Sequence, residues 1–126
     1  MSGSQNNPES PSASMVADLD AAAERLGSRK LLKKVAVLFR ENAPKHLENM
    51  RQAIDSSDTR LLEMSAHTFV SSIAYLAAES ATEVALALEQ MGRSGDLQGS
   101  EQAYETLLEE IGRLDDVLDE LSAEED

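Results

Sequence analysis

Hydrophobic residues recur every three or four positions along most of this chain, which is the spacing of one face of an α-helix. The clearest runs are Leu62, Ala66, Phe69, Ile73 and Leu76; Ala81, Val84, Ala85, Leu88 and Met91; and Tyr104, Leu107, Leu108, Ile111, Leu114, Leu118 and Leu121. Leu and Ala greatly outnumber the β-branched Val and Ile, and no Asn-Gly or Asp-Gly pair separates alternating apolar runs. The pattern therefore predicts an all-α protein.

Polar breaks delimit the first two helices. Gly27-Ser28 ends a short helix at about 17–26, and Ser28 is placed to cap the next helix. That helix is long, at about 28–54, and contains Pro44, which removes one backbone donor. We expect a single kinked helix here, and two helices that meet at the proline are the alternative.

Further breaks separate the remaining helices. Asp58 follows two serines and is expected to cap the third helix, while Ser80 and Glu83 have the spacing of a capping box for the fourth. A polar stretch at 92–99 that contains three glycines precedes the last helix, which Ser100 is expected to cap. Long amphipathic helices joined by short connections predict an antiparallel four-helix bundle, with the short N-terminal helix capping one end.

The N-terminal segment differs in composition from the rest of the chain. Residues 1–14 are rich in Ser, Asn and Pro and nearly free of large apolar side chains. Such a segment cannot bury enough surface to offset the entropy lost on ordering, so we interpret it as a flexible tail. Residues 15–126 are then expected to form one folded domain.

Composition excludes several classes of function. The chain has 24 acidic and 11 basic residues and a net charge of −13, which argues against binding to nucleic acid or to an anionic membrane. Because it has no cysteine, it has no disulfide, thiolate zinc site or cysteine nucleophile. No apolar run of about 18 residues and no secretory signal is visible, so we expect a cytoplasmic protein.

The two histidines are the side chains that ordinarily titrate near neutral pH. His67 falls roughly 140° around its helix from the apolar stripe, on the side away from the core. The residues that share this side with it are Glu63, Val70, Ser71 and Ala74, with Arg60 about two turns earlier. Small or apolar neighbours leave room for another molecule to reach the imidazole, although a lone exposed histidine is commonly an ordinary surface residue. His46 has no comparable setting, and the two histidines lack the spacing of a metal site.

The segment Ala66-His67-Thr68-Phe69-Val70-Ser71-Ser72 resembles the phosphorylation motif of histidine-containing phosphotransfer (HPt) domains, which typically reads Ala-His-Thr-Leu-Lys-Gly-Ser. Other segments resemble the same family in the same order. They are Asp18-Leu19-Asp20-Ala21-Ala22, Arg25-Leu26-Gly27, Leu31-Leu32, Leu38-Phe39, Ala43-Pro44, Leu76-Ala77-Ala78, and residues 88–97. The resemblance covers about residues 16–121, and the order and spacing of the segments make it specific.

The resemblance implies a relay in two-component signalling. An HPt histidine accepts a phosphoryl group from an aspartate of a receiver domain and passes it to another receiver, which makes His67 the expected phosphoacceptor. The implied partners are response-regulator receiver domains, a hybrid histidine kinase, or both. Magnesium is carried by the receiver in this family, so the chain is expected to need no cofactor or metal of its own. We expect a monomer without kinase activity.

Two positions depart from the family motif. Val70 stands where the family usually has Lys, which helps to neutralise the phosphate, and Ser71 stands where it usually has Gly, which lets a receiver come close. Arg60 is the candidate replacement cation, at about 11 Å along the helix axis from His67. The departures leave open an HPt-like adaptor that binds receiver or kinase domains without efficient phosphotransfer. An unrelated helical structural protein is a third possibility.

Overall fold

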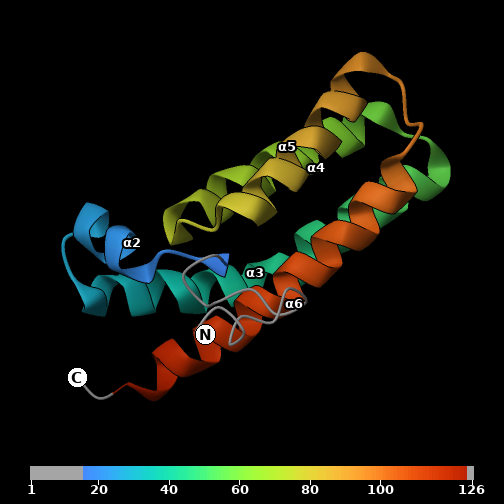
Figure 1. Cartoon of the computed structure of the whole chain (residues 1–126). Helices are drawn as coiled ribbons and strands as arrows, with labels where there is room; N and C mark the ends of the chain where they lie inside the picture. Colours follow the sequence, from blue (N-terminus) through green and yellow to red (C-terminus); the bar gives the residue numbers. More distant parts are fainter. Residues whose placement is uncertain (1–15, 125–126) are drawn as a thin grey trace, which may run out of the picture.

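The computed structural model describes residues 16–124, and this part of the chain consists of helices joined by short connections (Figure 1). The helices are α2 (Leu19–Leu26), α3 (Arg29–Ser56), α4 (Thr59–Ile73), the single 3-10 turn η2 (Ala74–Leu76), α5 (Glu79–Ser94) and α6 (Ser100–Ala123). The all-α prediction is confirmed. The predicted tail at 1–14 lies outside the described residues.

Helices α3, α4, α5 and α6 run alternately in opposite directions and pack as the predicted four-helix bundle (Figure 1). Helix α2 packs beside α3 and against η2, at the end of the bundle where α4 ends. Within the described range, no helix is both long enough and apolar enough to cross a membrane.

The core is formed by the apolar stripes that the sequence predicts. All five stripe residues of the α4–η2 segment are completely buried, as are Leu88 of α5 and Leu107, Leu114 and Leu118 of α6. Leu108 is an exception, because it is 43% exposed, and Val117 is buried in the same helix. The apolar face of α6 is therefore turned slightly from the predicted one.

The N-terminal caps of α3 and α4 follow the sequence prediction. The Ser28 hydroxyl accepts a hydrogen bond from the Leu31 N–H at 3.1 Å, and the Asp58 carboxylate accepts one from the Leu61 N–H at 3.0 Å. Helix α3 continues through Pro44 as one helix, so the alternative of two helices is wrong.

The predicted capping box of the fourth helix is wrong. Helix α5 begins at Glu79 with Ala78 as its N-cap residue, and no side chain caps it, so Ser80 already lies inside the first turn. The chain turns here through a left-handed backbone at Ala77, with φ of 54°, and this turn starts the helix earlier than the capping-box spacing suggests.

The predicted cap of the last helix is also wrong. Gly99 is the N-cap residue of α6, with φ of 87°, and Ser100 is the first residue of the helix. The Ser100 N–H donates to the Leu97 carbonyl at 3.0 Å, so a tight backbone turn starts the helix. A positive φ is easily adopted by glycine, which explains why the turn falls at this position.

Gly92 lies inside α5, although the sequence places it in the break before the last helix. A Cβ atom added at Gly92 would stand 2.5 Å from the backbone nitrogen of Glu63 and 2.8 Å from the carbonyl oxygen of Thr59. Both of these residues belong to α4, so the glycine allows the backbones of α4 and α5 to approach closely. This close approach brings the side chains of α5 next to His67.

Candidate functional site

His67 lies near the middle of α4 and faces solvent. Its side chain is 68% exposed, whereas Ala66 and Phe69 of the same helix are completely buried. The buried stripe holds α4 against its neighbours and therefore fixes the direction in which the imidazole projects. The prediction that His67 points away from the core is confirmed.

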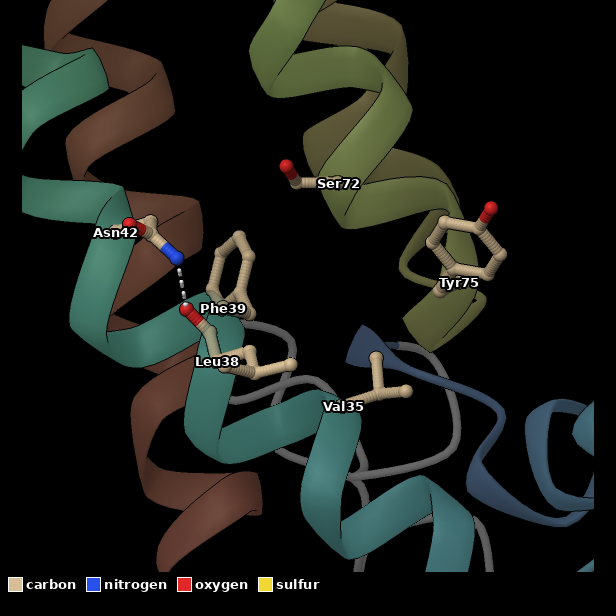
Figure 2. A pocket seen from close by; sticks show the side chains of 6 residues that line it. All are labelled: Val35, Leu38, Phe39, Asn42, Ser72 and Tyr75. Atoms are coloured by element: carbon tan, nitrogen blue, oxygen red, sulfur yellow. Dashed lines mark hydrogen bonds between the residues drawn. The ribbon is translucent and has the colours of Figure 1, made fainter.

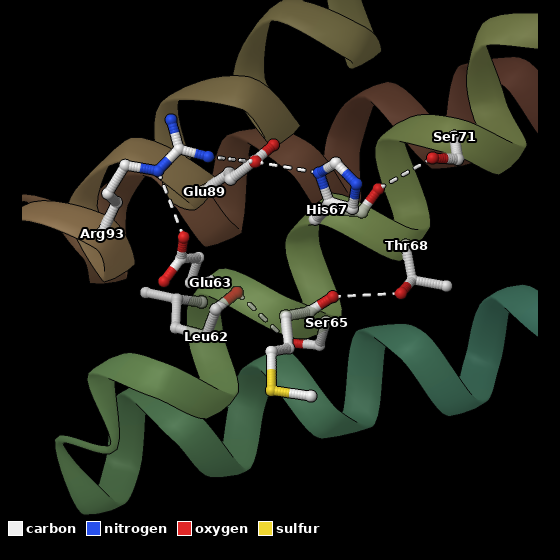
Figure 3. A network of polar contacts seen from close by, with 9 residues as sticks. Leu62, Glu63, Ser65, His67, Thr68, Ser71, Glu89 and Arg93 are labelled. Carbon is white, nitrogen blue, oxygen red and sulfur yellow. Dashed lines mark hydrogen bonds and ion pairs between the residues drawn. The ribbon is translucent and has the colours of Figure 1, made fainter.

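A buried carboxylate of the neighbouring helix holds one nitrogen of this imidazole (Figure 3). His67 Nδ1 lies 2.9 Å from Oε2 of Glu89, whose side chain is only 7% exposed. A carboxylate can only accept a hydrogen bond, so the bond assigns the proton to Nδ1. In a neutral imidazole the other nitrogen, Nε2, then carries the free lone pair.

Arg93, one turn after Glu89 on α5, completes the network (Figure 3). Its Nη2 donates to the same Glu89 oxygen at 2.8 Å, and its Nε donates to Glu63 Oε2 on α4 at 3.1 Å. A buried carboxylate without a charged partner is costly, so this guanidinium explains how Glu89 is tolerated beneath the helix surface. The two bonds also tie α5 to α4 beside His67.

His67 lies on the wall of an open hollow of about 520 Å³ between α4 and α5. The lining residues are Arg60, Glu63, Met64, His67, Thr68, Glu89 and Arg93. Arg60 makes no hydrogen bond or ion pair with the residues that the structure describes. The hollow therefore combines an imidazole nitrogen free to react with a cation that is free to meet an anionic group.

The remaining residues predicted to lie beside His67 differ in their exposure and position. Ser71 is exposed, and its hydroxyl donates back to the His67 carbonyl at 3.2 Å. Val70, by contrast, is half-buried and packs against the core, and Ala74 lies in η2 beside a different hollow, near Ala77. Glu63 and Arg60 therefore share a hollow with His67, whereas Val70 and Ala74 do not line it.

Sequence reasoning did not single out Glu89 or Arg93. A signal was nevertheless present. Glu89 stands four residues after Ala85 and eight after Ala81, so it lies on the apolar stripe of its own helix. A carboxylate on a buried stripe requires a partner, and Glu89 has two: His67 on the neighbouring helix α4 and Arg93 one turn later on its own helix.

An apolar groove of about 220 Å³ lies on the other side of α4, between this helix and α3 (Figure 2). It is lined by Val35, Leu38, Phe39, Asn42, Ser72 and Tyr75. Leu38 is 58% exposed and Tyr75 is 59% exposed, so the groove presents large apolar side chains to solvent. Ser72 is one turn beyond Thr68, which lines the hollow of His67, so the two surfaces adjoin along α4.

His46 lies in a different environment. It is half-buried on α3, with its ring edge-on to Phe69 at a centroid distance of 6.3 Å. Burial lowers the pKa of His46, and the neighbouring charge of Lys45 lowers it further. Among residues 16–124, no group of three or more His, Asp or Glu side chains is placed to hold a metal ion.

Residues 34–124 match the family model of the Hpt domain. This range covers well over half of the chain and runs from the early part of α3 to the end of α6, so it includes His67. Comparisons with curated proteins and with solved structures gave no match. Hpt domains serve histidine phosphotransfer in two-component phosphorelays and interact with receiver domains and histidine kinases. The helical bundle agrees with the match, and the chain belongs to the Hpt domain family.

Proposed function

We propose that this chain is a cytoplasmic phosphorelay intermediate in which His67 accepts a phosphoryl group from a receiver aspartate and passes it to another receiver. The observation that carries the proposal is an exposed imidazole whose Nδ1 is held by Glu89. This bond leaves the Nε2 lone pair free in an open hollow that a partner protein can cover.

In the proposed step, Nε2 of His67 attacks the phosphorus of an aspartyl phosphate in line with the bond that breaks. The N–P bond forms as the P–O bond to the aspartate breaks, and the electron pair of that bond returns to the carboxylate. Nδ1 keeps its proton throughout, and Glu89 lies against the positive charge that the ring acquires. Transfer to the second receiver reverses the same bond changes.

Two arginines of the hollow are the cations available to a phosphoryl group on His67. The Lys of the family motif is replaced by Val70, which is half-buried, and the cations that line the hollow are Arg60 and Arg93. Arg93 is bonded to two carboxylates, so Arg60 is the better candidate to meet the phosphoryl group. We expect magnesium on the receiver to neutralise most of the remaining charge, and we propose no cofactor for this chain.

The receiver is expected to cover the exposed face of α4 and to reach the apolar groove beside it. Leu38 and Tyr75 expose large apolar surfaces next to this face, and contiguous exposed apolar surface commonly marks a contact site for proteins. Contact there would add binding energy without occupying the hollow of His67.

The test is to incubate the chain with a receiver that carries a radiolabelled aspartyl phosphate, and separately with the small phosphodonor phosphoramidate. We expect an acid-labile, alkali-stable label on the wild-type chain and none on the His67→Gln variant. A wild-type chain that phosphoramidate leaves unlabelled, or a variant labelled as strongly as the wild type, would contradict the proposal.

Val70 and Ser71 favour a second candidate function, that of an adaptor which binds receiver or kinase domains without efficient transfer. It predicts a complex between the chain and a receiver but little transfer, and a sharp gain of transfer in the double variant Val70→Lys, Ser71→Gly. Because the Ser71 hydroxyl is bonded back to its own helix, it obstructs His67 less than a free side chain would. Unchanged transfer in the double variant counts against the adaptor.

A further inference from the structure

We infer that the Glu89 carboxylate makes phosphorylated His67 a short-lived phosphoryl donor and not a stable store. This inference rests on the proposed function of His67 and concerns the state that follows phosphorylation. Glu89 is a positioning residue, which acts on the reaction through the Nδ1 proton of the His67 imidazole.

The lifetime of a phosphohistidine depends on the group that leaves when the N–P bond breaks. When Nδ1 carries a proton, the electron pair of the N–P bond returns to Nε2 and a neutral imidazole leaves. The phosphoryl group is taken up by the attacking oxygen of an aspartate or of water. When Nδ1 carries no proton, an imidazolate would have to leave, and it is a far poorer leaving group. Any group that holds the Nδ1 proton therefore speeds transfer.

Glu89 is placed to hold this proton. Its oxygen lies 2.9 Å from Nδ1, and its side chain is only 7% exposed, so solvent screens the interaction weakly. A bonded carboxylate stabilises the protonated, positively charged ring more than the neutral ring. A neutral side chain in the same place would lack that preference.

The other charged groups near the ring do not replace Glu89. Arg60 and Glu63 of α4 and Arg93 of α5 line the same hollow, but none of them bonds the imidazole. Arg93 shares the Glu89 oxygen and therefore weakens its hold on the proton. On the α3 side, His46 packs against Phe69 of α4 and makes no bond with His67.

The experiment uses Glu89→Gln, which keeps the size and an acceptor oxygen but removes the charge. Glu105→Gln is the control, since Glu105 is an exposed carboxylate of α6 that does not line the hollow of His67. Each protein is phosphorylated with phosphoramidate and freed of the donor. The loss of phosphohistidine is then followed by intact mass from mildly acidic to alkaline pH.

We expect Glu89→Gln to lengthen the half-life at neutral pH by roughly threefold to tenfold, because a hydrogen bond to a charged acceptor is stronger than one to a neutral amide. The pH at which the phosphoryl group becomes labile should also fall, whereas Glu105→Gln should behave like the wild type. A half-life and pH profile unchanged in Glu89→Gln would overturn the inference.

Arg93→Gln gives a second readout that does not depend on the folding of the Glu89 variant. Removing the cation that shares the carboxylate should shorten the half-life, and a longer half-life would contradict the inference. Failure of the proposed function is a separate outcome, because the wild-type chain would then form no phosphohistidine at all.

Discussion

The two histidines of this bundle lie in contrasting environments. His67 is 68% exposed and has Nδ1 bonded to a buried carboxylate, whereas His46 is half-buried and lies edge-on to Phe69. The carboxylate orients one ring nitrogen and leaves the other free to react. The aromatic neighbour provides packing, and burial lowers the pKa of His46. A solvent-facing position and a polar partner on the next helix, rather than residue type, thus distinguish the candidate nucleophile.

The largest expected effect comes from replacing each histidine by glutamine in turn. His67→Gln should abolish phosphorylation by phosphoramidate and by a phosphorylated receiver, because it removes the Nε2 nucleophile. His46→Gln should keep both activities close to those of the wild type. Intact mass measures the phosphorylated fraction of each protein, and loss of phosphorylation in the His46 variant alone would reverse the assignment.

The environment of His67 depends on the close approach of α4 and α5, which Gly92→Ala should disturb. The new Cβ would stand 2.5 Å from the backbone nitrogen of Glu63, and we expect this overpacking to cost about 1–3 kcal/mol of stability. It should also separate Glu89 from His67 and slow phosphorylation. Urea unfolding measures the first effect, and the rate of labelling by phosphoramidate measures the second.

Gly112→Ala is the matched control, since nothing lies within 4 Å of a Cβ atom at this position in α6. It should stabilise the protein by about 0.5–1 kcal/mol through the higher helix propensity of Ala. Equal effects of the two substitutions would show that the close approach at Gly92 is not needed.

A substitution in the apolar groove separates the effect of partner binding from the effect of chemistry at His67. Leu38→Asp should slow transfer from a phosphorylated receiver by roughly tenfold, equivalent to about 1.4 kcal/mol, because it places a charge in the apolar contact. Phosphorylation by phosphoramidate should not change, since Leu38 does not line the hollow of His67. Leu86→Asp is the control, as Leu86 is 43% exposed on α5 and lines neither the groove nor the hollow. Receiver transfer that is equally fast in both variants argues against contact at the groove.

The smallest effect should come from the titration of His46. Its pKa in the folded protein lies below the ordinary value of 6.5, so the folded state favours the neutral ring. The unfolded chain therefore binds the proton more readily than the folded protein does. The free energy of unfolding should be highest above about pH 6.5 and should decline as the pH falls from there through the lower pKa of folded His46. His46→Gln should flatten this decline in urea unfolding, and identical pH dependence in both proteins would contradict it.

Most of the fold could be predicted from the sequence, because helical periodicity depends on local spacing. The α4 stripe from Leu62 to Ile73 is buried as predicted, and the caps at Ser28 and Asp58 form. The errors fall at Ala77, Gly92 and Gly99, where tertiary packing decides the backbone. A glycine next to a polar stretch resembles a break, whereas Gly92 is required by a close approach between helices.

Only the part of the site that lies on a single helix could be predicted from the sequence. Spacing along α4 is enough to place His67 and Glu63 on a solvent-facing side. Glu89 and Arg93 belong to α5, and their approach to His67 depends on how α5 is turned and shifted against α4. The periodicity of each helix taken alone does not determine that relative position, so the polar network appears only in three dimensions.

The most direct test of the central claim is NMR of the phosphorylated protein with isotopically labelled histidine, which identifies the nitrogen bonded to phosphorus. The proposed mechanism predicts one phosphohistidine, with phosphorus on Nε2 of His67 and a proton on Nδ1. Phosphorus on Nδ1 of His67, or on His46, would contradict it.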